Sequence, residues 1–197
     1  PETVASCAGA HGADAARRLN GPFFKAQARA GAGLPALPYL SAKWAMSLDG
    51  KIACHTGHSR WISGETSRRA VHVLRGEVDA VLIGSGTALA DDPRLTCRGV
   101  PGGAPLPVVL DRRARLPLGS QLVKGAPEAG LLVVVGSDAP AERRAALAAA
   151  GVELLEVEGP DSLTPLLLAL GARGCDHVLL EGGGEVLSAA FAAGLVD

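Results

Sequence analysis

Hydrophobic residues occur along this chain in short runs, which are separated by polar and glycine-containing stretches. Aliphatic side chains alone make up four of these runs, Ala80–Ile83, Val108–Leu110, Leu131–Val135 and Val178–Leu180. A short aliphatic run with polar or glycine boundaries is typical of a strand that is covered on both faces. The runs therefore predict a mostly parallel central sheet.

Residues 40–46 follow a different pattern, in which hydrophobic side chains alternate with polar or small ones. Alternation with a period of two predicts a strand with one buried face, and Asp49-Gly50 predicts a turn shortly after it. The segment Gly99–Pro107 is rich in glycine and proline and lies between two predicted strands. We interpret it as a surface loop.

Helical patterns lie between the predicted strands. Ser63 is placed to cap a helix that continues to Arg75, and two further helices are predicted over residues 141–150 and 162–170. A last helical pattern follows Gly184, where hydrophobic residues recur with helical spacing.

Strands and helices alternate over residues 39–197, which predicts one α/β domain with helices flanking the sheet. Residues 1–38 contain Ala, Gly and Pro with little periodicity and are predicted to be a linker or tail. The length of 197 residues fits this division, since it suffices for one domain of ordinary size and a short appendage.

Charged residues make up 20% of the chain and give a formal charge of −1. This balance offers no electrostatic basis for binding nucleic acid or an anionic membrane. No apolar run approaches the roughly 20 residues that cross a bilayer, and the first residues do not resemble a secretory signal. We therefore expect a soluble, cytoplasmic protein.

The cysteines are widely scattered, which fits reduced intracellular thiols better than a disulfide framework. Cys54, His55 and His58 lie close together in the sequence. No carboxylate or further cysteine follows them at the spacing of zinc ligands, so a solvated turn is favoured over a metal site.

A glycine-rich turn, Gly182-Gly183-Gly184, directly follows the last predicted strand and precedes a helix. Glycines allow a ligand to approach the backbone, and a helix N-terminus offers free N–H groups to a phosphate. The turn lacks the G-x-G-x-x-G fingerprint, so a dinucleotide site and a plain turn both remain open. Gly84-Ser85-Gly86 is a second, weaker candidate at what we expect to be the same edge of the sheet.

Three charged residues are candidates for ligand contacts. Asp91 precedes Asp92-Pro93 and predicts either a turn or a functional carboxylate. Arg75 and Arg98 suit an anionic substrate group, because a guanidinium binds phosphate through two parallel hydrogen bonds. The alternatives are a solvated helix end for Arg75 and a loop ion pair for Arg98.

Aromatic residues make up only 3% of the chain, so each is informative. Trp61 packs either over a flat ligand ring or in the core. Lys43 lies in the alternating strand and points to solvent, to a carboxylate or to a ligand. The motifs of a serine hydrolase, a Walker loop and a zinc deaminase are all absent from this sequence, so no deaminase activity is expected from this chain alone.

Four blocks of the sequence resemble the reductase domain of the bifunctional riboflavin biosynthesis deaminase–reductase. They are KWAMSLDGKIA (43–53), GHSRWIS (57–63), ADDPRLTCR (90–98), and LEGGG (180–184) with GLVD (194–197). Leu19-Asn20 and Phe23-Phe24 are similar to the segment where that family leaves its deaminase domain. The resemblance implies a dihydrofolate-reductase-like fold. It also implies that NADPH is used to reduce the ribosyl group of 5-amino-6-(5-phosphoribosylamino)uracil to the ribityl chain.

The resemblance also assigns residues to each ligand. The predicted cofactor contacts are Ala45, Trp61, Thr87, Asp91 and the residues of the turn that begins at Gly183, namely Gly183, Gly184, Glu185, Val186 and Leu187. The predicted substrate contacts are Ser59, Arg75, Leu95, Arg98 and Glu181, with Ser59 and the arginines around the phosphate. Lys43 matches a family lysine near the reacting sugar, where an ammonium can neutralise charge that develops during hydride delivery.

Two departures from the family pattern stand out. Arg112 occupies a position where the family usually has a small polar residue in contact with the cofactor, and an arginine there can reach the 2′-phosphate of NADPH. The chain also ends at Asp197, whereas the family continues with strands that finish the sheet and contribute to dimerisation. We therefore expect a C-terminally incomplete domain and, for the complete domain, a homodimer. The alternatives are a pteridine- or folate-type reductase and a non-catalytic, nucleotide-binding remnant.

Overall fold

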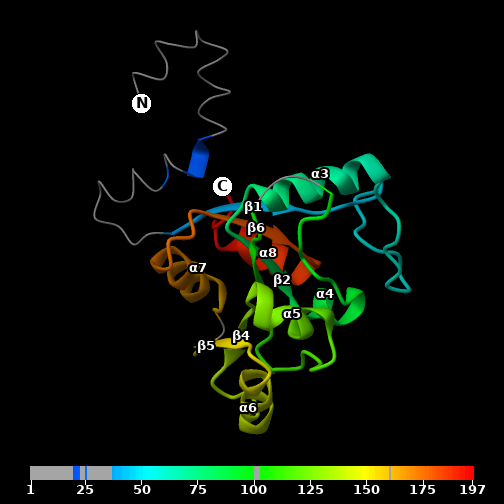
Figure 1. Cartoon of the computed structure of the whole chain (residues 1–197). Coiled ribbons are helices and arrows are strands. Elements are labelled where there is room, and N and C mark those ends of the chain that lie inside the picture. The colour runs from blue at the N-terminus through cyan, green and yellow to red at the C-terminus, as the bar shows by residue number, and fades with distance from the viewer. Residues whose placement is uncertain (1–19, 23–24, 26–36, 100–102, 160) are drawn as a thin grey trace, which may run out of the picture.

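Six strands form one sheet whose hydrogen-bonded neighbours are all parallel. The computed structural model describes residues 20–22, 25, 37–99, 103–159 and 161–197. The sheet order is β1-β6-β2-β3-β4-β5 (Figure 1). The strands are β1 (Tyr39–Lys43), β2 (Ala80–Gly84), β3 (Leu106–Leu110), β4 (Leu132–Gly136), β5 (Glu153–Val157) and β6 (His177–Glu181). The predicted parallel sheet is confirmed.

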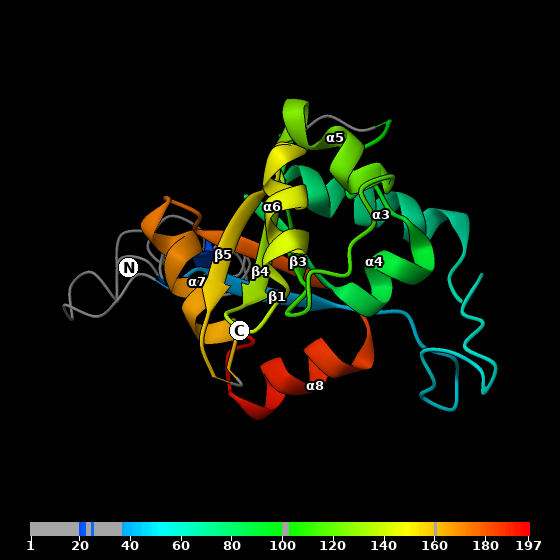
Figure 2. The same cartoon turned by 90° about the horizontal axis from the view of Figure 1, so that it is seen from below.

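Six helices of the described residues flank this sheet. They are α3 (Glu65–Gly76), α4 (Ser85–Asp91), α5 (Gln121–Ala129), α6 (Ala141–Ala149), α7 (Leu163–Ala172) and α8 (Gly184–Ala192). Figure 2 shows α7 and α8 on one face of the sheet and α4, α5 and α6 on the other. Each face has its own hydrophobic core, because side chains alternate between the two faces along every strand.

The strand predicted over residues 40–46 is shorter than expected. It ends at Lys43, whose Cα pairs with that of Glu181, and β6 also ends there. Beyond this point β1 has no strand partner, and the side chains of Trp44 and Met46 are 43% and 56% exposed. The predicted turn at Asp49-Gly50 is confirmed, since the Gly50 N–H donates to the Ser47 carbonyl.

The predicted helices are present with shifted boundaries. Ser63 does not cap α3, because Gly64 occupies the N-cap position and supplies no side chain. The segments predicted over 141–150 and 162–170 correspond to α6 and α7. Three further elements, α4, α5 and β5, were not predicted from the sequence.

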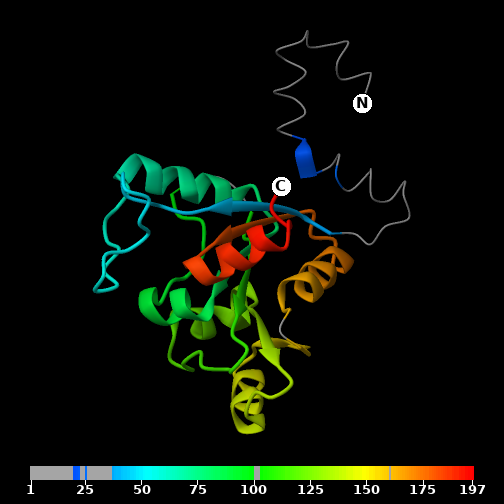
Figure 3. The ribbon, with the colours of Figure 1, turned by 180° about the vertical axis from the view of Figure 1, so that it is seen from behind.

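The last described residues pack against the edge strand β1. Leu40 donates its backbone N–H to the Asp197 carboxylate, and Asp197 donates its own N–H to the Leu40 carbonyl. Figure 3 shows α8 and the C-terminal segment beside β1. Most of the predicted linker over residues 1–38 lies outside the described residues. In the described ranges, no helix combines the length and apolarity that crossing a membrane requires.

Candidate functional site

The carboxyl ends of β1, β6 and β2 lie next to one another at one edge of the sheet. Parallel pairing places Lys43, the last residue of β1, beside Glu181, the last residue of β6. Gly84 ends the next strand, β2. Ligands of α/β proteins bind at this edge, because the loops that follow parallel strands gather there.

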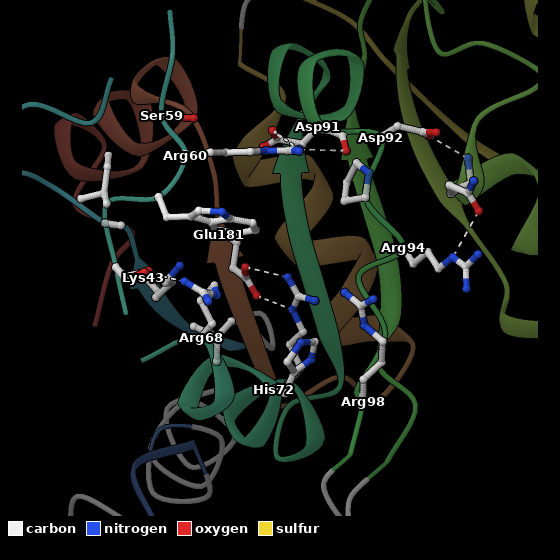
Figure 4. Close-up of a pocket in the computed structure, with 18 residues that line it drawn as sticks. Lys43, Ser59, Arg60, Arg68, His72, Asp91, Asp92, Arg94, Arg98 and Glu181 are labelled. Carbon is white, nitrogen blue, oxygen red and sulfur yellow. Dashed lines mark hydrogen bonds and ion pairs between the residues drawn. The ribbon is translucent and has the colours of Figure 1, made fainter. Parts of the chain in front are cut away.

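Three adjoining clefts open along this edge. The largest has a volume of about 690 Å³ and lies between α3, the segment Ser59–Ser63 and the segment 91–98 (Figure 4). A cleft of about 260 Å³ shares Lys43, Asp91 and Glu181 with it. A third, of about 370 Å³, lies over the glycine turn. Ser59 and Asp91 line all three, so the clefts form one continuous space.

An ion pair between Arg75 and Glu181 lies in the largest cleft. Arg75 Nε donates to Glu181 Oε1 at 2.7 Å and Arg75 Nη2 donates to Glu181 Oε2 at 2.9 Å. The side chains are only 13% and 12% exposed, so each charge depends on the other for compensation. Arg75 Nη1 also donates to the Thr96 carbonyl, at 3.3 Å. Much of the donor capacity of Arg75 is therefore used within the chain.

Lys43 and Arg98 differ from Arg75 in this respect. Both line the largest cleft, and neither side chain forms a hydrogen bond or ion pair within the described part of the chain. Their positive charges are thus free to bind an anionic group. Arg60, Arg68 and Arg94 add further positive charge to the same cleft, whose carboxylates are those of Asp91, Asp92 and Glu181.

The glycine turn packs closely against β2 and α4. The Gly183 N–H donates to Thr87 Oγ1 at 3.0 Å, and α8 begins at Gly184 with Gly183 as its N-cap. A Cβ atom on Gly183 would lie 3.4 Å from Thr87 Oγ1, and one on Gly84 only 2.7 Å from a methyl group of Val186. A side chain at Gly84 would therefore clash with Val186. Gly84, Gly183 and Gly184 line the third cleft, so backbone forms this part of its wall, and this geometry fits a phosphate-bearing cofactor.

The segment Ser59–Ser63 is tied to both sides of the cleft. Arg60 Nη2 donates to Asp91 Oδ1 at 2.9 Å. Arg68 donates to the Ser63 carbonyl, and its guanidinium lies 4.3 Å from the centre of the Trp61 ring. Trp61 is 72% exposed, which decides against the alternative that it fills the core.

The two carboxylates of the Asp91-Asp92-Pro93 motif have different partners. Asp91 ends α4 and faces the clefts, paired with Arg60. Asp92 adopts a left-handed conformation with φ of 40°, and its Oδ1 accepts from the Gln121 N–H at the start of α5. The turn interpretation thus holds for Asp92, whereas Asp91 is placed to contact a ligand.

The other predicted contacts also lie at this edge, with one difference. Leu187 is buried in the core and lines none of the clefts, while its N–H donates to the Gly183 carbonyl within α8. The predicted contacts that line at least one cleft are Lys43, Ala45, Ser59, Trp61, Arg75, Thr87, Asp91, Leu95, Arg98, Glu181, Gly183, Gly184, Glu185 and Val186.

Arg112 lines a separate groove of about 630 Å³ together with Arg113 and Arg115. The groove shares Ser85, Leu110, Glu185 and Val186 with the cleft over the glycine turn, so the two are adjacent. Arg112 donates to the Gly159 carbonyl and, at 2.9 Å, to Ser162 Oγ. Arg115 donates to Ser85 Oγ at 2.6 Å and lies 3.7 Å from the buried carboxylate of Asp111.

Several residues of the site were missed in the sequence. Arg68, His72 and Arg75 recur at i, i+4 and i+7 on α3, and all three line the largest cleft. Burial, and then the positive charge of Arg75, lower the pKa of His72 below its ordinary value. The helical spacing from Arg75 was the signal that would have identified the other two residues.

The cluster of Cys54, His55 and His58 forms an exposed turn. The Cys54 N–H donates to the His58 carbonyl, and a hydrogen bond with Thr56 lowers the pKa of the Cys54 thiol. Among the residues that the structure describes, no group of three or more potential metal-ligating side chains lies close enough to hold an ion.

The parallel sheet, with a glycine turn at its carboxyl edge and a cationic cleft beside it, defines an α/β protein whose candidate site lies where the strands end. Residues 38–197 match the model of the RibD C-terminal domain. The chain belongs to this family.

Relatives with established names support the assignment. The riboflavin biosynthesis protein RibD of Aquifex aeolicus is 35% identical over 185 residues, which cover 92% of this chain and 49% of that protein. The 2,5-diamino-6-ribosylamino-4(3H)-pyrimidinone 5′-phosphate reductase of Methanothermobacter thermautotrophicus is 41% identical, with 81% of this chain and 74% of that protein covered. Among solved structures, Acinetobacter baumannii RibD superposes with a TM-score of 0.77 at 33% identity, covering 94% of this chain and 49% of the other. The chain thus spans about half the length of the RibD proteins that it matches.

Proposed function

We propose that this chain catalyses the reductase step of riboflavin biosynthesis, in which the ribosyl group of 5-amino-6-(5-phosphoribosylamino)uracil is reduced to the ribityl chain at the expense of NADPH. The observation that carries the proposal is the continuity of two clefts, one over a glycine turn and one lined by unpaired cations. The family assignment and the reductase among the relatives support it. A simple pteridine substrate would leave the cationic wall without an anionic group to bind.

The cleft over the glycine turn is our proposed site for the cofactor. The turn of Gly183 and Gly184 would face the pyrophosphate. The N–H groups of Gly184 and Glu185, in the first turn of α8, have no acceptor within the helix, and together with the helix dipole they would favour an anion there. Thr87 holds the turn through its hydrogen bond to Gly183. The remaining proposed cofactor contacts are Ala45, Trp61, Asp91, Glu185 and Val186, whereas the burial of Leu187 in the core removes it from this set.

The adjoining cleft is our proposed site for the substrate. Ser59 and Arg98 would bind the phosphate, with Arg75 contributing the donors that its ion pair leaves free. Glu181, held in place by Arg75, and Leu95 would contact the rest of the molecule.

Lys43 is the proposed proton donor. NADPH, when bound, supplies the hydride that reduces the sugar carbon C1. As the new C1–H bond forms, another bond to C1 breaks, either the π bond of an open-chain C1=N or the C1–O bond of the closed ring, and its electron pair moves to that nitrogen or oxygen. The unpaired ammonium of Lys43 would give this atom a proton directly or through water.

Two assays with the purified chain test this proposal. NADPH oxidation should be observed with the phosphorylated substrate, with a ribitylamino product identified by mass. Ribose 5-phosphate should inhibit competitively if the cationic cleft binds the phosphate. A pteridine that is reduced faster than the phosphorylated substrate, or NADPH binding without any turnover, would contradict the proposal in favour of one of the alternatives.

Arg112 is our proposed contact for the 2′-phosphate of NADPH, because its groove adjoins the cleft over the glycine turn. Arg112→Ser should weaken NADPH binding by about tenfold, as expected for one lost charged hydrogen bond, and leave NADH binding unchanged. Dissociation constants from fluorescence titration measure the preference. An equal loss for both cofactors would assign Arg112 to folding through its contacts with Gly159 and Ser162.

We further propose that residues 39–197 form the reductase domain behind a linker, that its fold is dihydrofolate-reductase-like, and that the complete domain acts as a homodimer in the cytoplasm. The family match over residues 38–197 supports the domain boundary. Light scattering during size-exclusion chromatography tests the oligomeric state.

A further inference from the structure

The Thr96 carbonyl receives two hydrogen bonds from helix α3. His72 Nδ1 donates at 3.2 Å and Arg75 Nη1 donates at 3.3 Å. Thr96 belongs to a segment without helix or strand that follows α4, and it lies between Leu95 and Arg98, both proposed substrate contacts. These two bonds therefore connect the wall formed by α3 with the segment on the opposite side of the cleft.

The hydrogen bond to Thr96 fixes which nitrogen of the His72 ring carries a proton. A carbonyl oxygen can only accept, so the proton lies on Nδ1. Burial, and then the charge of Arg75, lower the pKa of His72, with a smaller contribution from Arg98, whereas the hydrogen bond to Thr96 and the charge of Glu181 oppose this shift. At neutral pH the ring is thus uncharged, and its N–H is held toward Thr96.

The segment needs such a restraint. Leu95 has a φ of 56°, in the left-handed region that a leucine rarely adopts, while its side chain is only 2% exposed. A strained backbone persists only where its surroundings hold it in place. Arg98 has no partner within the described residues, so the position of its guanidinium depends on the backbone that carries it.

We propose that His72 is a positioning residue for the substrate: through the Thr96 carbonyl it holds the segment Leu95–Arg98 against α3, so that Leu95 and Arg98 face the cleft. This inference rests on the proposed function. Arg75 cannot report on the restraint alone, since its removal would also break the ion pair with Glu181. The His72 side chain forms one hydrogen bond, to Thr96, but the ring also lines the cleft, so hydrogen exchange and rescue by an amide donor separate the restraint from a direct contact with the substrate.

The test compares three variants. His72→Phe keeps the ring but removes the donor. His72→Asn supplies an amide N–H near the position of Nδ1. Val73→Phe is the matched control, because Val73 is exposed on the same helix and lines none of the clefts. For His72→Phe we expect the substrate KM to rise about fivefold, in line with one lost hydrogen bond, with kcat within about twofold and the NADPH dissociation constant unchanged.

His72→Asn should restore most of the KM, and Val73→Phe should leave it unchanged. Hydrogen exchange provides a readout that does not depend on catalysis. In His72→Phe the amides of residues 94–98 should exchange faster, while those of β2 and β6 keep their protection.

An unchanged KM and unchanged exchange in a folded His72→Phe protein would overturn the inference, as would an equal KM increase in Val73→Phe. If the parent chain shows no turnover, the proposed function fails. The exchange of residues 94–98 then still decides whether His72 restrains the segment. If His72→Phe does not fold, His72→Asn is compared with His72→Gln, whose longer side chain does not place its amide near the position of Nδ1. Equal KM values and equal exchange rates in these two variants would overturn the inference.

Discussion

Helices α3 and α7 show how differently one sheet uses the helices around it. α7 buries Leu163, Leu166, Leu167 and Leu170 in the core, whereas α3 has no buried residue at all. Both contain hydrophobic residues, but α3 also carries Arg68, His72 and Arg75 on the face that lines the largest cleft. α7 therefore contributes to stability through apolar burial, and α3 contributes a wall of charged and polar groups to the site.

The same contrast extends to the two ends of the sheet. At the carboxyl edge, β1 ends at Lys43 and leads into an irregular segment with the exposed side chains of Trp44 and Trp61, while β6 leads through a glycine turn into α8. At the amino edge, the Asp79 carboxylate accepts from the backbone N–H groups of Asp176 and His177 and closes the connection into β6. Side chains that can contact a ligand thus gather at the carboxyl edge, where the chain is least regular. At the amino edge, the polar groups of the chain form hydrogen bonds with one another.

The largest expected effect lies on the core side of this comparison. Leu166→Ala removes a fully buried side chain of α7 and should lower the free energy of unfolding by about 3 kcal/mol. Urea unfolding measures the loss. The substrate KM of the folded fraction should stay unchanged, because α7 lines none of the three clefts that share Ser59 and Asp91. A substrate KM that rises together with the loss of stability would show that the role of α7 in the core is not separate from the role of α3 in the cleft.

The next effect lies on the side of the clefts. Lys43→Ala should lower kcat by about 100-fold, the lower range for a lost general acid, with little change in cofactor binding or stability. Lys43→Arg is the control, because it keeps the charge but is a poorer proton donor. Turnover close to that of the parent chain in Lys43→Ala would remove Lys43 from the mechanism.

The smallest effect concerns the amino edge and depends on pH. Burial lowers the pKa of His177 below its ordinary value of 6.5, against the opposing charges of Asp79, Glu77 and Asp197. The unfolded chain then takes up a proton at higher pH than the folded chain, so stability falls as the pH drops below about 6.5. Urea unfolding at several pH values should show a weaker decrease for His177→Gln. The same decrease in both proteins would show that His177 is not its source.

Much of the sheet could be predicted because four of its strands are short aliphatic runs with clear boundaries. The elements that were missed have weaker local signals. β5 has glutamates at Glu153 and Glu156 because it is an exposed edge strand, and α5 contains Gly125 and Pro127. α4 begins with Ser85-Gly86, which resembles a loop, and only the burial of Ala88 against the core supports its helical form.

The site was predictable to the extent that its residues lie in recognisable blocks. The contacts that organise it were not, because they join distant residues. Arg60 reaches Asp91 across 31 positions, and His72 reaches Thr96 across 24. Such pairs form only when the folded sheet brings α3, α4 and the intervening segments together, and no local pattern in the sequence encodes them.

The most direct test of the central claim is the fate of hydrogen from the cofactor. The chain is incubated with the phosphorylated substrate and NADPH in which both hydrogens at C4 of the nicotinamide ring are deuterium, and the product is analysed by mass spectrometry and NMR. A reductase whose clefts bring the two ligands together should give a ribityl product with deuterium at C1. A product without deuterium at C1 would contradict the account. Binding of both ligands without consumption of either would also contradict it.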